Sequence, residues 1–280
     1  MIVAVASGKG GTGKTTVATG LALSLEKEMC FLDCDVEEPN AHLLLHPVIA
    51  SAEPVYLPVP VFVPDRCSGC GYCLDVCNYN ALALIADKVI VFEQMCHGCG
   101  GCIGLCPTGT FEEGRRAIGV VEEGRTGKIF FAHGKLNVGE ALVPPIIKNL
   151  RQRLDTVMPT VIDCPPGASC PVVQSVRGVD FCLAVTEPTP FGRHDLEAVV
   201  EMLKILGVPC GVVINRADLG DAGVKDFCNE KGIPVLAEIP FDEEVVRSAA
   251  AGVAVTERNP SWRRVFRGLW GEIERLTNYA

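Results

Sequence analysis

The sequence predicts an α/β protein in which helices cover both faces of a mostly parallel sheet, with a small α+β domain inserted into the chain. Three observations support this prediction. Apolar runs of strand length recur along the chain, and amphipathic helical patterns lie between several of them. This regularity breaks between about residues 46 and 114, and eight of the fifteen cysteines fall within that interval.

Most of the apolar runs read as strands buried on both faces, as in a parallel sheet. They cover residues 2–6, 30–32, 129–132, 160–162, 181–186, 211–214 and 235–239. Between them, apolar residues recur at helical spacing over residues 17–25 and again over residues 196–206. Alternating strands and helices predict a parallel sheet with helices on both sides.

The last helical pattern contains both tryptophans of the chain. Trp262, Phe266, Leu269 and Ile273 repeat at the spacing of one helix face, with arginines elsewhere on the helix. We predict a final helix that covers the sheet. The alternative is a helix that lies on a membrane surface.

A proline-rich stretch, residues 54–64, leads into the interval that contains the cysteines, and we interpret it as a linker into the inserted domain. Within the insert, residues 81–85 and 88–92 flank Asp87, which we take as a turn residue. These two runs predict a short β-hairpin between two groups of cysteines.

The cysteines of the insert form two runs with the same spacing. The runs are Cys67, Cys70, Cys73 and Cys77, and then Cys96, Cys99, Cys102 and Cys106, followed by Pro107. Thiolates two residues apart can bind adjacent corners of one cubane, and the last cysteine of a run reaches the neighbouring cluster in two-cluster ferredoxins. The doubled pattern favours two [4Fe-4S] clusters. Two zinc sites built from the same thiolates are the alternative.

Residues 64–111 resemble the bacterial two-cluster ferredoxin module. The resemblance implies that the fourth cysteine of each run joins the first three of the other run. The implied sets are Cys67, Cys70 and Cys73 with Cys106, and Cys96, Cys99 and Cys102 with Cys77. Asn78 departs from the module, because a proline is expected at that position.

A phosphate-binding loop lies between the first predicted strand and the first predicted helix. Residues 8–15 fit the pattern GxxxxGK[ST] in the context that confirms this motif. Glycines let backbone amides turn toward phosphate oxygens, and the helix N-terminus adds partial positive charge. We expect Lys14 to bridge the β- and γ-phosphates of ATP and the Thr15 hydroxyl to bind Mg²⁺. The residues predicted to hold the nucleotide here are Gly8, Lys9, Gly10, Gly11, Thr12, Gly13, Lys14, Thr15 and Thr16.

The additional lysine in this loop, Lys9, gives the chain a resemblance to the MinD/Mrp/ParA family of deviant-Walker ATPases, which includes the nitrogenase iron protein. The resemblance covers nearly the whole chain and is strongest to members that carry an inserted ferredoxin domain. It implies a nucleotide-dependent dimer, formed with a second copy or with a related ATPase. In such a dimer Lys9 reaches the partner's nucleotide.

The resemblance also assigns roles to residues at the ends of predicted strands, where ligands gather in open α/β sheets. It implies that Asp35 positions or deprotonates the attacking water, that Asp33 supports Mg²⁺ through water, and that Asp163 is a second magnesium residue. Without the family, paired aspartates such as Asp33 and Asp35 are more often helix caps.

The family places three further segments near the nucleotide, which correspond to residues 186–188, 213–216 and 239–242. The Asn215 amide would pair with the edge of adenine, and Arg216 and Pro240 would lie close to it. Asp195 falls where related ATPases place an acidic partner for the signature lysine, although a carboxylate on a helix face is an equally good interpretation.

Composition excludes some classes of function. A formal net charge of −9 argues against broad attraction to nucleic acid, so no nucleic-acid partner is expected. No apolar stretch reaches 18 residues, and the N-terminus has no basic region before its apolar run, so we expect neither an integral membrane segment nor a signal peptide. We therefore expect a cytoplasmic protein with reduced thiols.

The expected organisation is an ATPase domain in two parts, residues 1–60 and 114–280, with a two-cluster ferredoxin domain at residues 61–113. The expected function is that of an ATPase whose nucleotide state controls electron transfer or docking by the insert, together with an unidentified redox or iron–sulfur partner protein. The alternatives are an Mrp-type carrier or assembly scaffold for clusters, and a positioning ATPase with structural or sensory clusters.

Overall fold

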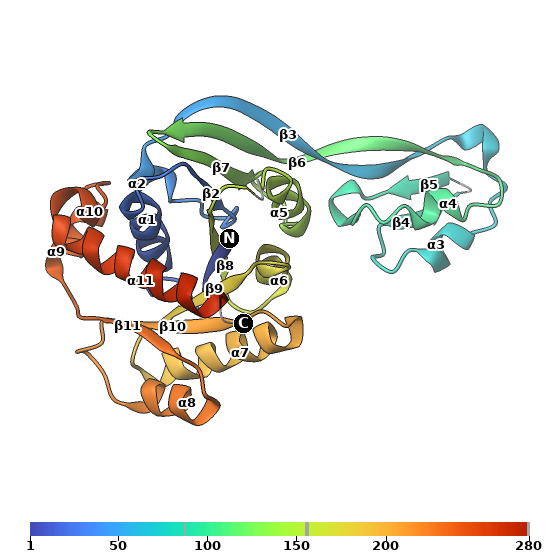
Figure 1. Cartoon of the computed structure of the whole chain (residues 1–280). Coiled ribbons are helices and arrows are strands. Elements are labelled where there is room, and N and C mark those ends of the chain that lie inside the picture. Colours follow the sequence, from blue (N-terminus) through green and yellow to red (C-terminus); the bar gives the residue numbers. More distant parts are fainter. Residues whose placement is uncertain (87, 155–156, 279–280) are drawn as a thin grey trace.

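The computed structural model describes residues 1–86, 88–154 and 157–278. Among these residues, nine strands form one sheet in the order β11-β10-β9-β1-β8-β2-β7-β6-β3, and β4 and β5 form a separate hairpin. Neighbouring strands from β11 to β7 are parallel, whereas β6 is antiparallel to both β7 and β3. The predicted mostly parallel α/β fold is confirmed (Figure 1).

All seven predicted strands of the main sheet are present. Their observed bounds are β1 (Ile2–Ser7), β2 (Met29–Asp33), β7 (Ile129–Leu136), β8 (Thr160–Pro166), β9 (Phe181–Thr186), β10 (Cys210–Asn215) and β11 (Val235–Ile239). The central strands β1, β8 and β9 are almost wholly buried, because apolar side chains on both of their faces pack under helices.

Helices cover both faces of the sheet. The apolar core on one face involves α1 (Lys14–Ser24) and α11 (Pro260–Asn278). The core on the other face involves α5 (Pro144–Arg151), α6 (Cys170–Val176), α7 (Pro190–Leu206) and α8 (Gly223–Lys231). The short helices α2 (His42–Leu45), α9 (Glu243–Ala250) and α10 (Val255–Arg258) lie near α1.

The final helix, α11, covers the sheet as predicted. Its face with Trp262, Phe266 and Ile273 is buried, and the ring of Phe266 lies so close to Gly20 of α1 that a Cβ there would come within 2.5 Å of it. Since the apolar face is covered inside the protein, the membrane-surface alternative loses its basis. No helix of the described residues is long and apolar enough to cross a membrane.

The proline-rich stretch is not a linker, and this prediction is wrong. It belongs to β3 (Val48–Phe62), which pairs over its whole length with β6 (Phe111–Thr126). A strand can contain Pro54, Pro58 and Pro60 because β3 is at the edge of the sheet, where one side of the strand needs no hydrogen-bond donors. The strand β6 has no regular apolar period and was not predicted from the sequence.

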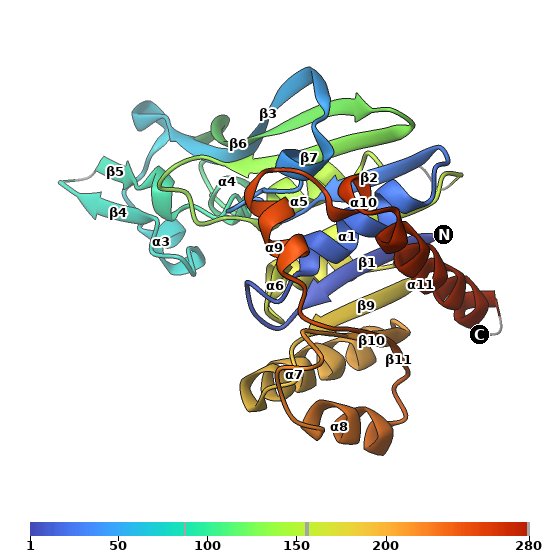
Figure 2. The same ribbon diagram turned by 90° about the vertical axis from the view of Figure 1, so that its left-hand side faces the viewer.

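Together β3 and β6 form a long antiparallel ribbon that leaves the sheet and carries a small lobe at its far end (Figures 1 and 2). We call residues 63–110 the cysteine lobe. It contains η1 (Pro64–Arg66), α3 (Tyr72–Val76), the hairpin β4 (Leu82–Ile85) and β5 (Lys88–Val91), η2 (Glu93–Met95) and α4 (Gly101–Gly104). The predicted hairpin is therefore present, and its predicted turn residue, Asp87, lies outside the described residues.

Candidate functional site

The loop between β1 and α1 has the open backbone that phosphate binding requires. Gly11 and Gly13 have φ angles of 80° and 91°, which favour glycine. A Cβ on Gly13 would lie 2.4 Å from the Asn215 amide nitrogen, whereas nothing lies within 4 Å of a Cβ on Gly10 or Gly11. Among the described residues, no side chain caps the N-terminus of α1. The first amides of α1 are therefore available to an anion.

This loop forms one wall of a cavity of about 640 Å³. The cavity brings together residues from the phosphate loop, the strand ends and the last helices. Of the predicted site residues, those that line it are Gly10, Gly11, Gly13, Lys14, Thr15, Thr16, Asp35, Asn215, Arg216 and Pro240. Its apolar wall includes Phe241, Val245 and Trp262. Phe241 lies in a loop that the resemblance places near the nucleotide, whereas Val245 was missed and Trp262 was interpreted only as a helix-packing residue.

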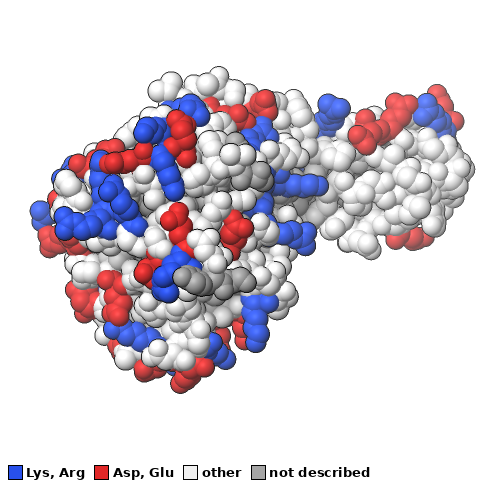
Figure 3. Space-filling view, in the orientation of Figure 1, with Lys and Arg blue, Asp and Glu red and all other residues white. Residues whose placement is uncertain are grey.

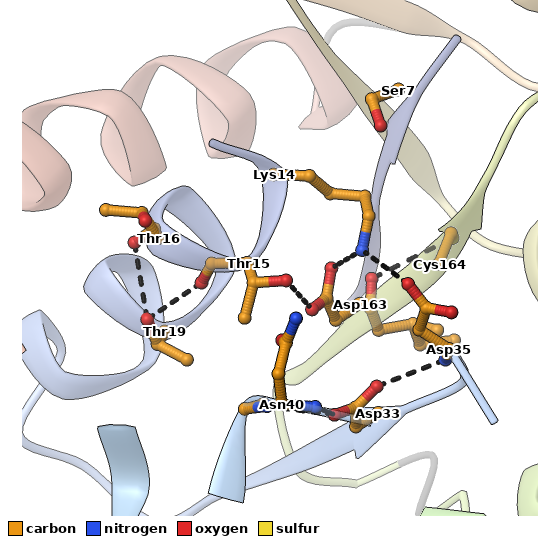
Figure 4. A network of polar contacts seen from close by, with 12 residues as sticks. Ser7, Lys14, Thr15, Thr16, Thr19, Asp33, Asp35, Asn40, Asp163 and Cys164 are labelled. Carbon is orange, nitrogen blue, oxygen red and sulfur yellow. Dashed lines mark hydrogen bonds and ion pairs between the residues drawn. The ribbon is translucent and has the colours of Figure 1, made fainter. Parts of the chain in front are cut away.

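A polar network occupies the phosphate end of the cavity (Figure 4). The buried Lys14 ammonium donates to Oδ1 of Asp163 at 2.6 Å, and the Thr15 hydroxyl donates to Oδ2 of the same carboxylate at 2.7 Å. The second acid, Asp35, lies 3.8 Å from the Lys14 ammonium. Burial opposes the charge on Lys14, but the combined attraction of Asp163, Asp33 and Asp35 outweighs it and raises the pKa of the lysine.

Asp33 is fully buried beside this network and binds backbone amides of the loop after β2. Its carboxylate accepts hydrogen bonds from the backbone amides of Asp35, Asn40 and Ala41 at 3.0 to 3.1 Å, and Ala41 precedes α2. The carboxylate thus stabilises the turn after β2. It does not act as the helix cap considered from the sequence, because the three amides that it binds precede the first residue of α2.

Three carboxylates and one ammonium share this end of the cavity. Burial and the nearby Asp163 raise the pKa of Asp33 to about 7, and burial, opposed by Lys14, raises that of Asp35 to about 6. The group has an excess of negative charge in a desolvated place. A divalent cation with oxygen ligands would relieve it.

The signature lysine has a partner that sequence reasoning missed. The Lys9 ammonium lies 3.2 Å from Glu187, which also forms a close ion pair with Arg216. Asp195, the acid expected near Lys9, instead packs against Gly8, where a Cβ would lie 2.4 Å from the Asp195 Cβ. Glu187 directly follows β9, in a loop that the resemblance places near the nucleotide, but its pairing with Lys9 was not predicted.

Asn215, which the resemblance predicts to pair with adenine, is fixed by the phosphate loop. Its amide nitrogen donates to the backbone oxygen of Thr12 at 2.8 Å, so the end of β10 and the loop hold each other in place. Gly8, Lys9, Thr12, Asp33 and Asp163 surround the cavity without lining it.

The eight cysteines of the lobe surround two small hollows. One hollow is lined by Cys67, Cys70, Cys73 and Cys106, and the other by Cys77, Cys96, Cys99 and Cys102. These are the two sets that the resemblance implies. The second hollow also touches Pro58 and Pro60 of β3, so it lies at the ribbon end of the lobe. In the described part of the chain, no three His, Cys, Asp or Glu side chains are arranged to hold a single metal ion.

Comparison with known proteins identifies the family. Residues 3–255 match the CobQ/CobB/MinD/ParA nucleotide binding domain, and the chain belongs to this family of P-loop ATPases. Two uncharacterized proteins of Methanocaldococcus jannaschii are similar along nearly their whole length. One is 32% identical over 92% of this chain and 93% of its own, and the other is 30% identical over 98% and 96%.

More distant relatives have named functions. An iron-sulfur cluster carrier protein of Pseudomonas fragi is 24% identical over 93% of this chain and 79% of its own. Among solved structures, the cell division ATPase MinD of Pyrococcus furiosus matches with a TM-score of 0.61 at 20% identity, over 98% of both chains. The septum site-determining protein MinD of Pyrococcus horikoshii, complexed with Mg-ADP, matches with a TM-score of 0.60 at 19% identity, over 98% of this chain and 96% of its own. These likenesses show the fold.

Proposed function

We propose that this protein is an ATP-hydrolysing, dimeric switch whose nucleotide state controls electron transfer or docking by two iron–sulfur clusters in the cysteine lobe. The family supplies the nucleotide-binding half of this proposal. The lobe and its attachment to the sheet supply the other half.

The cavity residues fit Mg-ATP. Backbone amides and Lys14 face the place for phosphates, and the Thr15 hydroxyl and Asp163 put oxygen ligands side by side, as Mg²⁺ prefers. Asp35 lines the same cavity and could orient water for hydrolysis. Lys9, with its side chain 38% exposed, could exchange Glu187 for the nucleotide of a second subunit.

The cysteine sets fit cubane clusters better than zinc. Zinc requires four ligands that converge on one ion at about 2.3 Å. A cubane distributes its four thiolates over the corners of a cage, so the sulfurs need not converge. Each hollow is surrounded by four cysteines, and no described set of ligands converges on a single ion. This arrangement is the one that a cubane needs. Two such clusters would let the lobe accept and pass on single electrons.

The continuous hydrogen bonding from the nucleotide site to the lobe is the observation that carries this proposal. The strand β2, which ends at Asp33, pairs with β7, and β7 pairs with β6. The strand β6 then runs out along β3 to the lobe. A change in the loop after β2 therefore acts on a rigid sheet whose edge strands hold the clusters' ligands.

A role as cluster carrier is the second candidate, and the similarity to the Pseudomonas fragi carrier favours it. The two roles differ in what happens to the clusters. A carrier would release them to an acceptor protein during ATP turnover, whereas a redox switch would retain them.

The test begins with protein purified without oxygen. We expect about eight irons and eight sulfides per chain, as two four-iron cubanes require. ATP affinity is then measured for the oxidised and the reduced protein, and linkage requires the two values to differ if one equilibrium serves both sites. Stoichiometric zinc would refute the clusters. Equal affinities would refute the coupling, and loss of iron to an acceptor during turnover would favour the carrier.

A further inference from the structure

A row of four polar side chains crosses the sheet from the phosphate site to the ribbon. Asp163 of β8 is in register with Asp33 of β2, Asp33 with His133 of β7, and His133 with Glu122 of β6. Side chains of residues directly opposite each other on neighbouring strands lie on the same face of a sheet. All four therefore lie on the face that α1 covers, and Lys14 reaches the first of them.

The outer part of the row is held by strong contacts. His133 is 1% exposed, and its Nε2 lies 2.7 Å from the Glu122 carboxylate. Because a carboxylate only accepts, Nε2 carries the proton and donates. The Lys135 ammonium donates to the same oxygen of Glu122 at 2.8 Å. Glu122 is thus fixed between two donors from β7.

The loop after β2 places a second histidine on this row. The amides of Asn40 and Ala41 bind the Asp33 carboxylate, and the next residue is His42. The His42 ring meets the His133 ring edge to face, with 5.1 Å between centroids. The loop that responds to nucleotide in this proposal therefore touches both Asp33 and His133.

Each histidine has an unused ring nitrogen at this contact. Nδ1 of His42 and Nδ1 of His133 are both buried and have no hydrogen-bond partner among the described residues. Burial lowers the pKa of His133, and that of His42 is lowered by burial and Lys135, so both rings are neutral near pH 7. A buried polar atom without a partner is costly. A small movement of His42 could let one ring donate a hydrogen bond to the other. The contact between the two rings then has two arrangements, one with this hydrogen bond and one without it.

We propose that His42 and His133 are positioning residues that transmit the state of the loop after β2 to Glu122 and so to the β6 ribbon. The inference rests on the proposed coupling between nucleotide and lobe and names the contact that would produce it. Movement of the loop repositions the His42 ring, and His133 passes the change to Glu122 at the base of the ribbon. Neither histidine touches the nucleotide cavity.

Amide hydrogen exchange on the full-length, anaerobically purified protein tests this inference. Exchange in residues 111–126 and in the cysteine lobe is compared without nucleotide and with a non-hydrolysable ATP analogue plus Mg²⁺. The variants are His133→Phe and His42→Phe, which keep ring packing and remove the ring nitrogens. His42 is only part-buried, so its variant remains informative if His133→Phe folds poorly. His46→Gln is the matched control, because His46 follows α2 but bonds Gly252, outside the row.

We expect the wild type and His46→Gln to show a nucleotide-dependent change in ribbon and lobe exchange. The two phenylalanine variants should lose this change while keeping wild-type nucleotide affinity and iron content. A full response in both variants would overturn the relay and leave the proposed function intact. No response in the wild type would overturn the coupling itself, and the relay with it.

Discussion

The sheet and the cysteine lobe are built by different means. The sheet buries large side chains such as Phe31 and Phe131 completely, and the ends of its strands help to line the nucleotide cavity. The lobe's buried apolar cluster is small, with Cys73, Leu82 and Val89 packed against Phe111 at the start of β6. Its visible surface carries few charges (Figure 3). A core this small rarely stabilises an independent unit. We infer that the sheet folds by burial and that the lobe depends on the two clusters that we propose for its cysteines.

Removal of the clusters should have the largest effect. Chelation under oxidising conditions should unfold the cysteine lobe as a unit, because metal binding and folding are coupled in so small a module. The sheet should stay folded. Limited proteolysis would show this as rapid cleavage within residues 63–110 and a stable remainder. A lobe that resists protease after its iron is gone would contradict the comparison.

Lys9→Ala and Asp35→Ala should lose hydrolysis while keeping most nucleotide binding, because both residues would act chiefly in the transition state. A cation supplied in trans to a phosphoryl group contributes about 10³ to 10⁵ in rate, so we expect a loss of that order for Lys9→Ala. Single-turnover hydrolysis measures it, and ATP should trap Asp35→Ala as a dimer in light scattering. Wild-type turnover by Lys9→Ala would show that the lysine has no catalytic role.

Lys14→Ala should remove nucleotide binding and leave the cysteine lobe intact. Truncating one member of a buried, hydrogen-bonded charge pair costs about 2–5 kcal/mol, which corresponds to roughly 30- to 4,000-fold in affinity. Equilibrium titration with labelled ATP provides the measurement. The variant's iron content serves as the control, since the two regions fold separately in this account.

Gly13→Ala should be the mildest of these changes. The left-handed backbone and the close Asn215 amide make a side chain unfavourable there, and we expect a loss of about 1–3 kcal/mol in the free energy of unfolding of the sheet. Gly10→Ala is the matched control, because its Cβ would meet open space, and it should change stability by less than about 0.5 kcal/mol. Urea unfolding of nucleotide-free protein compares the two, and equal values would contradict the strain argument.

The sequence predicts those elements whose burial leaves a pattern. Strand β9 was predicted to the residue, because both of its faces are buried and require apolar side chains. The edge strand β11 was also predicted to the residue, although only its last residue, Ile239, is buried. The ribbon left no such pattern. The strand β6 is rich in charged residues and partly exposed, and the prolines of β3 are tolerated because no described strand pairs with its outer edge.

The candidate site also contains residues that the sequence predicts and residues that it does not. The phosphate loop and its cavity contacts follow from local motifs, and the two cysteine sets match the resemblance. The pairing of Lys9 with Glu187 and the row through His133 depend on strand order. Strand order brings together residues far apart in the chain, and no local spacing encodes it.

The most direct test of the coupling between the two regions is an anaerobic redox titration of the clusters without nucleotide, with Mg-ADP, and with a non-hydrolysable ATP analogue. Linked sites usually interact by about 1–3 kcal/mol, which for a one-electron centre is a shift of roughly 40–130 mV at about 59 mV per tenfold change. We predict a shift in this range between the ADP and ATP-analogue forms. Potentials that coincide in all three conditions would contradict the account.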